Sequence, residues 1–134
     1  MWRVMAAVVF SVGLMGAAGA QQVSLRDVPQ IDNGLFVVGL ADQIRKRCPV
    51  ISARFFRAIN YLRTLEKEAR ALGYSEAEVT RHLESDAEKN RLRARAKVYM
   101  TDRGYGQNET GYCALGRAEI AQETNIGALL RLRN

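Results

Sequence analysis

The chain has 134 residues, of which 25% are charged and 48% are hydrophobic, and its formal net charge is +6. This length fits one domain, and the supply of apolar residues excludes a disordered chain. Two cysteines and one histidine are too few to supply the ligands of a zinc or copper site.

Residues 1–20 predict a secretory signal peptide. Arg3 supplies a positive head, residues 4–17 are almost wholly apolar, and Ala18-Gly19-Ala20 provides the small residues of a cleavage site. The apolar run is shorter than the roughly twenty residues that a spanning helix needs, although an uncleaved anchor is the alternative. We therefore expect cleavage after Ala20, export to the periplasm or beyond, and no stable membrane span afterwards.

Residues 21–134 then form a single helical domain, whose net charge is +5 because the removed segment carries one cation and no acid. Its first part, residues 21–32, looks irregular. Asp32 or Asn33 is expected to cap a first helix that ends near Arg47, because Cys48-Pro49 interrupts a helix.

The segment from Ile51 to Leu72 has the most regular apolar pattern. Its apolar residues are spaced by alternating steps of four and three, which predicts one stripe along a second helix; they are Ile51, Phe55, Ala58, Leu62, Leu65, Ala69 and Leu72. Leu62 lies in the middle of this stripe, so Leu62→Asp is expected to unfold the domain, whereas Glu68→Lys should hardly matter. Gly73 is a natural left-handed helix end.

Ser75 and Glu78 form a capping-box pattern that begins a third helix, expected from Glu76 to about Thr101. Its first half is acidic and its second half is basic, which suits the helix dipole. The apolar positions expected on its inner face are Val79, Leu83, Ala87, Ala94 and Val98. We expect the second and third helices to pair as an antiparallel hairpin.

The C-terminal part is expected to be helical as well. Asn108 can cap a fourth helix from about Glu109 to Glu123, and residues 126–132 are expected to add a last turn. Since no segment alternates as a strand does, the pattern predicts an all-α fold: a small helical domain built on the hairpin.

Cys48 and Cys113 predict one disulfide, because an even number of cysteines in an exported chain is typical of disulfide pairing. The hairpin places the start of the second helix beside the end of the third. The two thiols, which flank these points, are thereby expected at the same end of the molecule.

The residues do not indicate a catalytic centre or a cofactor. His82 is the single histidine, and no nucleophile has a recognisable motif around it. Glu84 and Glu88 share a helical face, as a carboxylate pair of a hydrolase could, but such pairs are also typical of solvated helices. We expect no enzyme, no metal and no cofactor.

The most distinctive pattern is electrostatic. Cations from three segments are expected to converge at one end of the hairpin, near Tyr99 and Tyr105, and acids at the other. This basic pole is either a solvated surface or a contact site for an anionic envelope component or an acidic protein; export disfavours nucleic acid. The candidate contact residues are Arg45, Lys46, Arg47, Arg54, Arg57, Arg93, Arg95, Lys97 and Arg103.

From Cys48 onward the chain resembles a domain-of-unknown-function family of small exported alphaproteobacterial proteins. The resemblance rests on Cys48-Pro49, Gly73-Tyr74-Ser75, the segment Gly111-Tyr112-Cys113-Ala114-Leu115-Gly116-Arg117 and the segment Ile126-Gly127-Ala128-Leu129-Leu130-Arg131. It implies a periplasmic setting and brings neither an activity nor functional residues.

Three functions stay open from the sequence. The first is a non-enzymatic periplasmic binding or interaction protein, the second a small periplasmic chaperone, and the third a hydrolase that uses helix-borne carboxylates. An interaction protein should have a defined contact patch, and a chaperone should have exposed apolar surface. A hydrolase should have a cleft with perturbed carboxylates.

Overall fold

The computed structural model describes residues 22–134, so the predicted signal peptide lies outside the described residues. The described elements are the 3-10 turn η1 (Leu25–Asp27), α1 (Pro29–Arg47), β1 (Ile51–Ala53), α2 (Phe55–Ala71), α3 (Glu76–Glu84), α4 (Asp86–Asp102), α5 (Glu109–Ala121), the 3-10 turn η2 (Gly127–Leu129) and β2 (Leu130–Leu132). The expected all-α class with one disulfide is confirmed.

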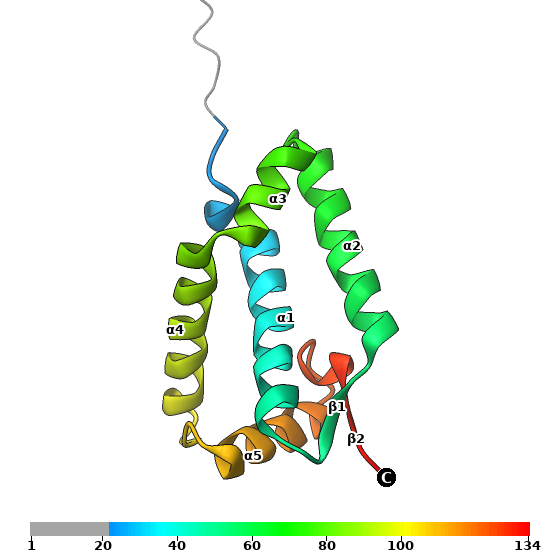
Figure 1. The fold of residues 1–134 in the computed structure, drawn as a ribbon, viewed down its shortest axis with the longest axis vertical. Coiled ribbons are helices and arrows are strands. Elements are labelled where there is room, and N and C mark those ends of the chain that lie inside the picture. The colour runs from blue at the N-terminus through cyan, green and yellow to red at the C-terminus, as the bar shows by residue number, and fades with distance from the viewer. Residues whose placement is uncertain (1–21) are drawn as a thin grey trace, which may run out of the picture.

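Helix α1 is the central element. It lies between α4 and α2, with α3 near the end where α1 begins and α5 across the end where α1 finishes (Figure 1); these are called the upper and lower ends. The expectation that residues 21–32 are irregular is wrong for residues 29–32, which form the first turn of α1, while residues 22–28 contain only the short turn η1. Pro29 opens α1, because a proline in the first helical turn loses no hydrogen bond, and Asp32 is buried rather than a cap.

The second helix starts later than its apolar stripe predicts. Ile51 belongs to the short strand β1, which pairs antiparallel with β2 in the register Ile51–Leu132 and Ala53–Leu130. Along α2, Leu65 and Ala69 are buried, whereas Leu62 is half-buried and Phe55 is 65% exposed. The stripe therefore faces α1 without being fully covered.

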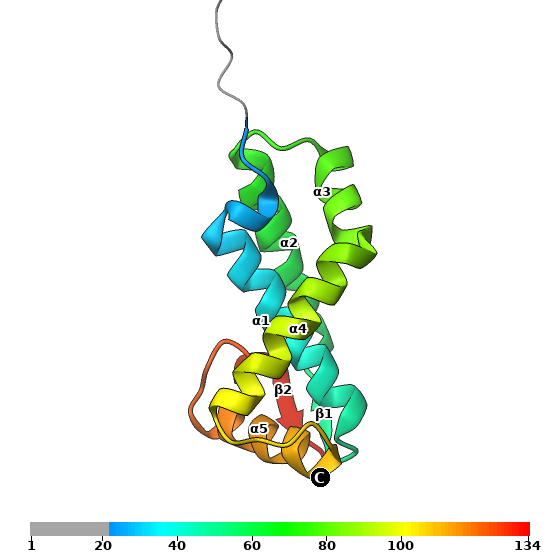
Figure 2. The same ribbon diagram turned by 90° about the vertical axis from the view of Figure 1, so that its left-hand side faces the viewer.

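The third helix is divided in two. Ser85 ends α3, and its hydroxyl accepts a hydrogen bond from the Glu88 backbone N–H at the start of α4. The break redirects the chain, so that α4 crosses α1 (Figure 2) instead of running along α2 as the expected hairpin requires. The face expected to be buried is exposed at Val98, while Ala96 and Met100 are buried.

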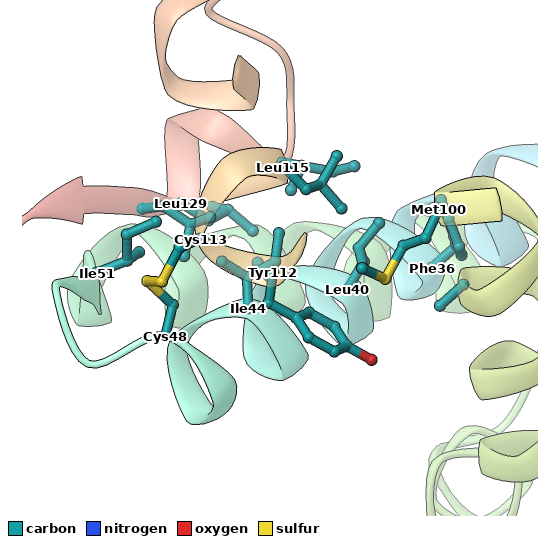
Figure 3. Packing of buried hydrophobic residues seen from close by; sticks show 14 residues of the cluster. Phe36, Leu40, Ile44, Cys48, Ile51, Met100, Tyr112, Cys113, Leu115 and Leu129 are labelled. Carbon is teal, nitrogen blue, oxygen red and sulfur yellow. A yellow bond between two sulfur atoms is a disulfide. The ribbon is translucent and has the colours of Figure 1, made fainter. Parts of the chain in front are cut away.

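The main core gathers at the lower end. Leu40 and Ile44 of α1 meet Met100 of α4 and Leu115 of α5, and each of these side chains is at most 1% exposed (Figure 3). The predicted disulfide is confirmed, with Cα atoms 5.1 Å apart. It ties the residue that ends α1 to the first turns of α5.

The C-terminal predictions are partly confirmed. The Asn108 side chain caps α5 by accepting a hydrogen bond from the Gly111 N–H at 2.9 Å. The tail adds one turn, η2, as expected, but this turn is a 3-10 turn and the chain then continues as the strand β2. Leu129 and Leu130 are buried there, which closes the core beneath the start of α2.

Candidate functional site

An uncovered apolar surface runs along the seam between α1 and α2. Ile31, Leu35 and Val38 recur at helical spacing on α1, and Leu62 and Ile59 face them from α2. Because the helices are antiparallel, the end of α1 lies beside the start of α2 (Figure 1). We call this feature the α1–α2 groove.

The groove contains two hollows that share Leu62 as a wall. The lower one has a volume of about 500 Å³ and is lined mainly by apolar side chains, among them Val38, Ala58 and Ile59. The upper one, about 240 Å³, is closed by α3 through Val79, His82 and Leu83. From Phe55 to Ala69 the groove follows α2 for about 21 Å, at 1.5 Å per residue.

Cations lie at the lower end of the groove and next to it. Arg45 and Arg133 line it directly. Arg54 donates its Nε–H to the Leu130 carbonyl at 3.1 Å, and Arg57 donates one N–H to the Ala128 carbonyl at 3.4 Å. Since a guanidinium carries five N–H donors, these backbone contacts hold the side chains while leaving donors for an anionic group.

One acid lies among these cations. Asp42 lines the lower hollow and forms ion pairs with Arg45 and Lys46, both at 2.6 Å. The charge at this end is therefore positive, with Arg54, Arg57 and Arg133 in excess over the neutralised Asp42.

The nine cations expected at one pole are distributed over separate places. Arg45 lines the lower hollow, and Arg54 and Arg57 contact backbone carbonyls next to it. Lys46 and Arg93 line a different hollow of about 360 Å³ between α1 and α4. The others lie along α4 or at the lower end of α1: Arg47 against the Tyr112 ring, Arg95 against the Phe36 ring, Arg103 against the Tyr99 ring, and Lys97 on the exposed face of α4.

Arg95 belongs to a charge cluster that the sequence analysis did not identify. Asp32 accepts hydrogen bonds from Arg91 and Arg95, and Glu88 accepts them from Arg91 and Arg26. The i,i+3 spacing of Glu88 and Arg91 is a signal for one of these pairs, but the distant partners come together only because α4 crosses α1. The cluster joins η1, α1 and α4.

The pKa of Glu88 indicates which chemical role the carboxylates of this cluster can have. Burial acts to raise the pKa of Glu88, but hydrogen bonds from Arg26 and Arg91 hold that pKa below its ordinary value. An acid that stays ionised and doubly paired is suited to fastening elements together and poorly suited to donating a proton.

His82 lies at the upper end of the groove, on α3. Its Nε2 is buried without a hydrogen-bond partner, and burial lowers the pKa of the imidazole from its ordinary value. Glu78 lies four residues before His82 on the same helix, but its carboxylate accepts the Ser75 backbone N–H at 2.6 Å. The histidine is thus a neutral wall of the upper hollow.

Residues 22–134 can also be considered as a metal site and as a membrane span. No group of three or more His, Cys, Asp and Glu side chains there is arranged to hold a metal ion. No helix in that range is both long and apolar enough to cross a membrane.

The fold and the groove define a small, disulfide-fastened helical protein with an open apolar seam between two antiparallel helices. The chain belongs to a family of unknown function, DUF5333, whose family model matches residues 23–131. No curated protein and no solved structure matches the chain. The expected resemblance to a family of unknown function is thereby confirmed, while export and an alphaproteobacterial range stay predictions.

Proposed function

We propose that this protein is a non-enzymatic interaction protein of the periplasm, and that its contact surface is the α1–α2 groove. The observation that carries the proposal is the uncovered apolar seam with cations at its lower end. An apolar surface of this kind on a soluble domain is unfavourable unless a partner covers it.

Aromatic side chains at the mouth of the groove support a contact role. Phe55 lines the lower hollow and is 65% exposed, and its neighbour Phe56 is 81% exposed. Their rings pack edge to face with centroids 5.8 Å apart. Large aromatic residues are enriched where protein surfaces become buried on binding, so this pair is suited to anchor a partner.

The charge at the lower end favours an anionic partner. Of the nine cations expected to contact a partner, Arg45 lines the lower hollow and Arg54 and Arg57 lie next to it, so these three are kept as contact residues. Arg95 is assigned to fastening α4 onto α1 instead, because its donors are engaged by Asp32 and Asn33.

The periplasmic setting draws support from the disulfide. Cys48 is fully buried and paired with Cys113, and stable disulfides persist mainly in oxidising compartments. The setting is tested by N-terminal mass spectrometry of the protein recovered from the cell envelope. A chain that begins at Gln21 supports export with cleavage, and an intact Met1 on membrane-bound protein contradicts it.

A chaperone is the second candidate, favoured by the exposed Phe55 and Phe56. A chaperone binds many unfolded clients through non-specific apolar contact, whereas an interaction protein binds a defined partner with saturation. Suppression of the aggregation of an unrelated unfolded protein, lost in Phe55→Ser/Phe56→Ser, would favour the chaperone.

The proposed contact surface is tested by capture from envelope extract with three folded variants. Ile59→Glu places a charge in the lower hollow, and Arg54→Glu/Arg57→Glu reverses the lower cations. Val98→Glu on α4 is the matched control, because Val98 is 58% exposed and lines neither hollow of the groove.

We expect the two groove variants to lose the captured partner and the control to retain it. Circular dichroism confirms that all three are folded. Equal capture by all variants would place the contact surface elsewhere.

A further inference from the structure

We infer that the partner enters the α1–α2 groove as an amphipathic helix whose acidic residues lie over the lower end. This inference rests on the proposed contact surface and adds the chemistry of its occupant.

The shape of the groove favours a helix. Its walls are two antiparallel helices, each with apolar residues at steps of three and four, which is the surface that a third helix fills in a three-helix bundle. Val38, Ile59 and Leu62 provide the central contact. The length of about 21 Å corresponds to about fourteen helical residues, or four anchor positions at i, i+3 or i+4, i+7 and i+11.

The width of the apolar surface favours a helix over a single acyl chain as the occupant of the groove. Apolar residues of the groove stay exposed at its rim: Phe55 and Leu83 line the hollows and are still 65% and 42% exposed, and Phe56, which lines neither hollow, is 81% exposed. A single hydrocarbon chain would fill the hollows and leave this rim in water. The apolar face of a helix, about 10 Å across with its side chains, covers both.

Charge determines the orientation and the kind of partner. Arg133 lines the lower hollow, and Arg54 and Arg57 contact backbone carbonyls next to it, which gives this end an excess of positive charge. Glu66 lines the upper hollow. A helix with Asp or Glu at one end therefore fits in one direction. A second copy of this chain is disfavoured, since each mature copy carries a net charge of +5 and the groove cations would meet no excess of acid.

The test introduces the photo-crosslinking residue p-benzoylphenylalanine at Ile59, in the groove, and separately at Val98, on α4. The full chain is expressed and exported, cells are irradiated, and adducts formed at Ile59 but not at Val98 are mapped by mass spectrometry. We expect an Ile59 adduct with one protein segment that has apolar residues at helical spacing and Asp or Glu at one end.

The mapped segment is then synthesised as a peptide and titrated against the purified protein. Its Kd should rise about tenfold or more between about 50 and 500 mM salt, because the charge contacts are screened. Arg54→Glu/Arg57→Glu should weaken binding at least about tenfold and Ile59→Glu about a hundredfold, with Val98→Glu unchanged.

The outcomes separate this inference from the proposed function. An Ile59-specific adduct with a lipid, with a second copy, or with a segment that is not acidic and amphipathic overturns the helix inference and leaves the groove as the contact surface. The absence of any Ile59-specific adduct, together with unchanged capture by the groove variants, contradicts both.

Discussion

Leu62 shows how the surroundings of one side chain change the meaning of a sequence pattern. Its place in the middle of the apolar stripe predicts burial and unfolding by Leu62→Asp. That expectation is wrong in its premise, because Leu62 is half-buried and forms the wall shared by the two hollows of the groove. A charge there reaches water, so its desolvation penalty is small.

Leu40 is the residue whose truncation should destabilise the fold. It is 1% exposed in the lower core, so Leu40→Ala should lower the free energy of unfolding by about 2–5 kcal/mol. Leu62→Glu should lower it much less and still give a cooperative transition. Urea denaturation followed by circular dichroism compares the two, and greater damage from Leu62→Glu would contradict the open groove.

His82 and Glu88 predict that the domain loses stability in acid. Burial lowers the pKa of His82, acids Glu88 and Asp32 act to raise it, and cations Arg91 and Arg26 act to lower it, with a net lowering. The pKa of Glu88 is also lowered. For each group the unfolded chain binds the proton more tightly than the folded chain does. The group therefore contributes fully to the free energy of unfolding above its unfolded pKa, and this contribution is lost as the pH falls below that value.

The two groups act in different pH ranges, which makes the prediction specific. The His82 contribution is lost as the pH falls below its ordinary pKa of 6.5, and the Glu88 contribution as the pH falls below 4.5. His82→Gln should therefore flatten the decline in melting temperature between about pH 7 and pH 5 and leave the decline below it. An unchanged profile in His82→Gln would show that the imidazole is not the group responsible.

At the scale of elements, the division between α3 and α4 decides the architecture. Ser85-Asp86-Ala87-Glu88 has the spacing of a helix N-terminus, and the Ser85 hydroxyl does accept the Glu88 N–H. The break turns the chain so that α4 packs on α1 and leaves the other side of the seam open.

Ser85→Ala tests this capping contact. Removal of the hydroxyl leaves a backbone N–H of the first turn without its partner, so the free energy of unfolding should fall by about 0.5–2 kcal/mol. Thr80→Ala, at an exposed position inside α3, is the matched control and should change it by less than about 0.5 kcal/mol. Thermal denaturation measures both, and equal effects would show that Ser85 is not an effective cap.

At the scale of the whole molecule, the disulfide joins parts that are far apart in the sequence. Cys48 and Cys113 are 65 residues apart, and a loop of this length predicts a stabilisation of about 4 kcal/mol in the chain-entropy description. Reduction should lower the melting temperature by about 10 °C or more. The double variant Cys48→Ser/Cys113→Ser should have a melting temperature close to that of the reduced parent, and reductant should not change it. A parent whose two thiols are labelled after reduction but whose melting temperature is unchanged would contradict the prediction.

The helical class, the ends of α1 and α2 at Cys48 and Gly73, the Asn108 cap and the disulfide pair could all be predicted from sequence. Each depends on local chemistry: a proline that interrupts a helix, a glycine that accepts a left-handed conformation, a side chain that caps, and two cysteines without other partners. These effects depend on residues that are neighbours in the sequence. They are therefore the same whatever the tertiary packing, and the sequence alone predicts them.

The strands, the Asp32–Glu88 charge cluster and the α1–α2 groove were decided by the tertiary structure. β1 and β2 are three residues each and are stable only through their pairing with one another, about eighty residues apart. Asp32 meets Arg91 and Arg95 because α4 crosses α1. The apolar stripe of α2 is visible in the sequence, but whether another helix covers it depends on the direction that the chain takes after Ser85. A periodic pattern shows which side of a helix avoids water; the packing of the whole chain determines whether that side becomes core or a site for a partner.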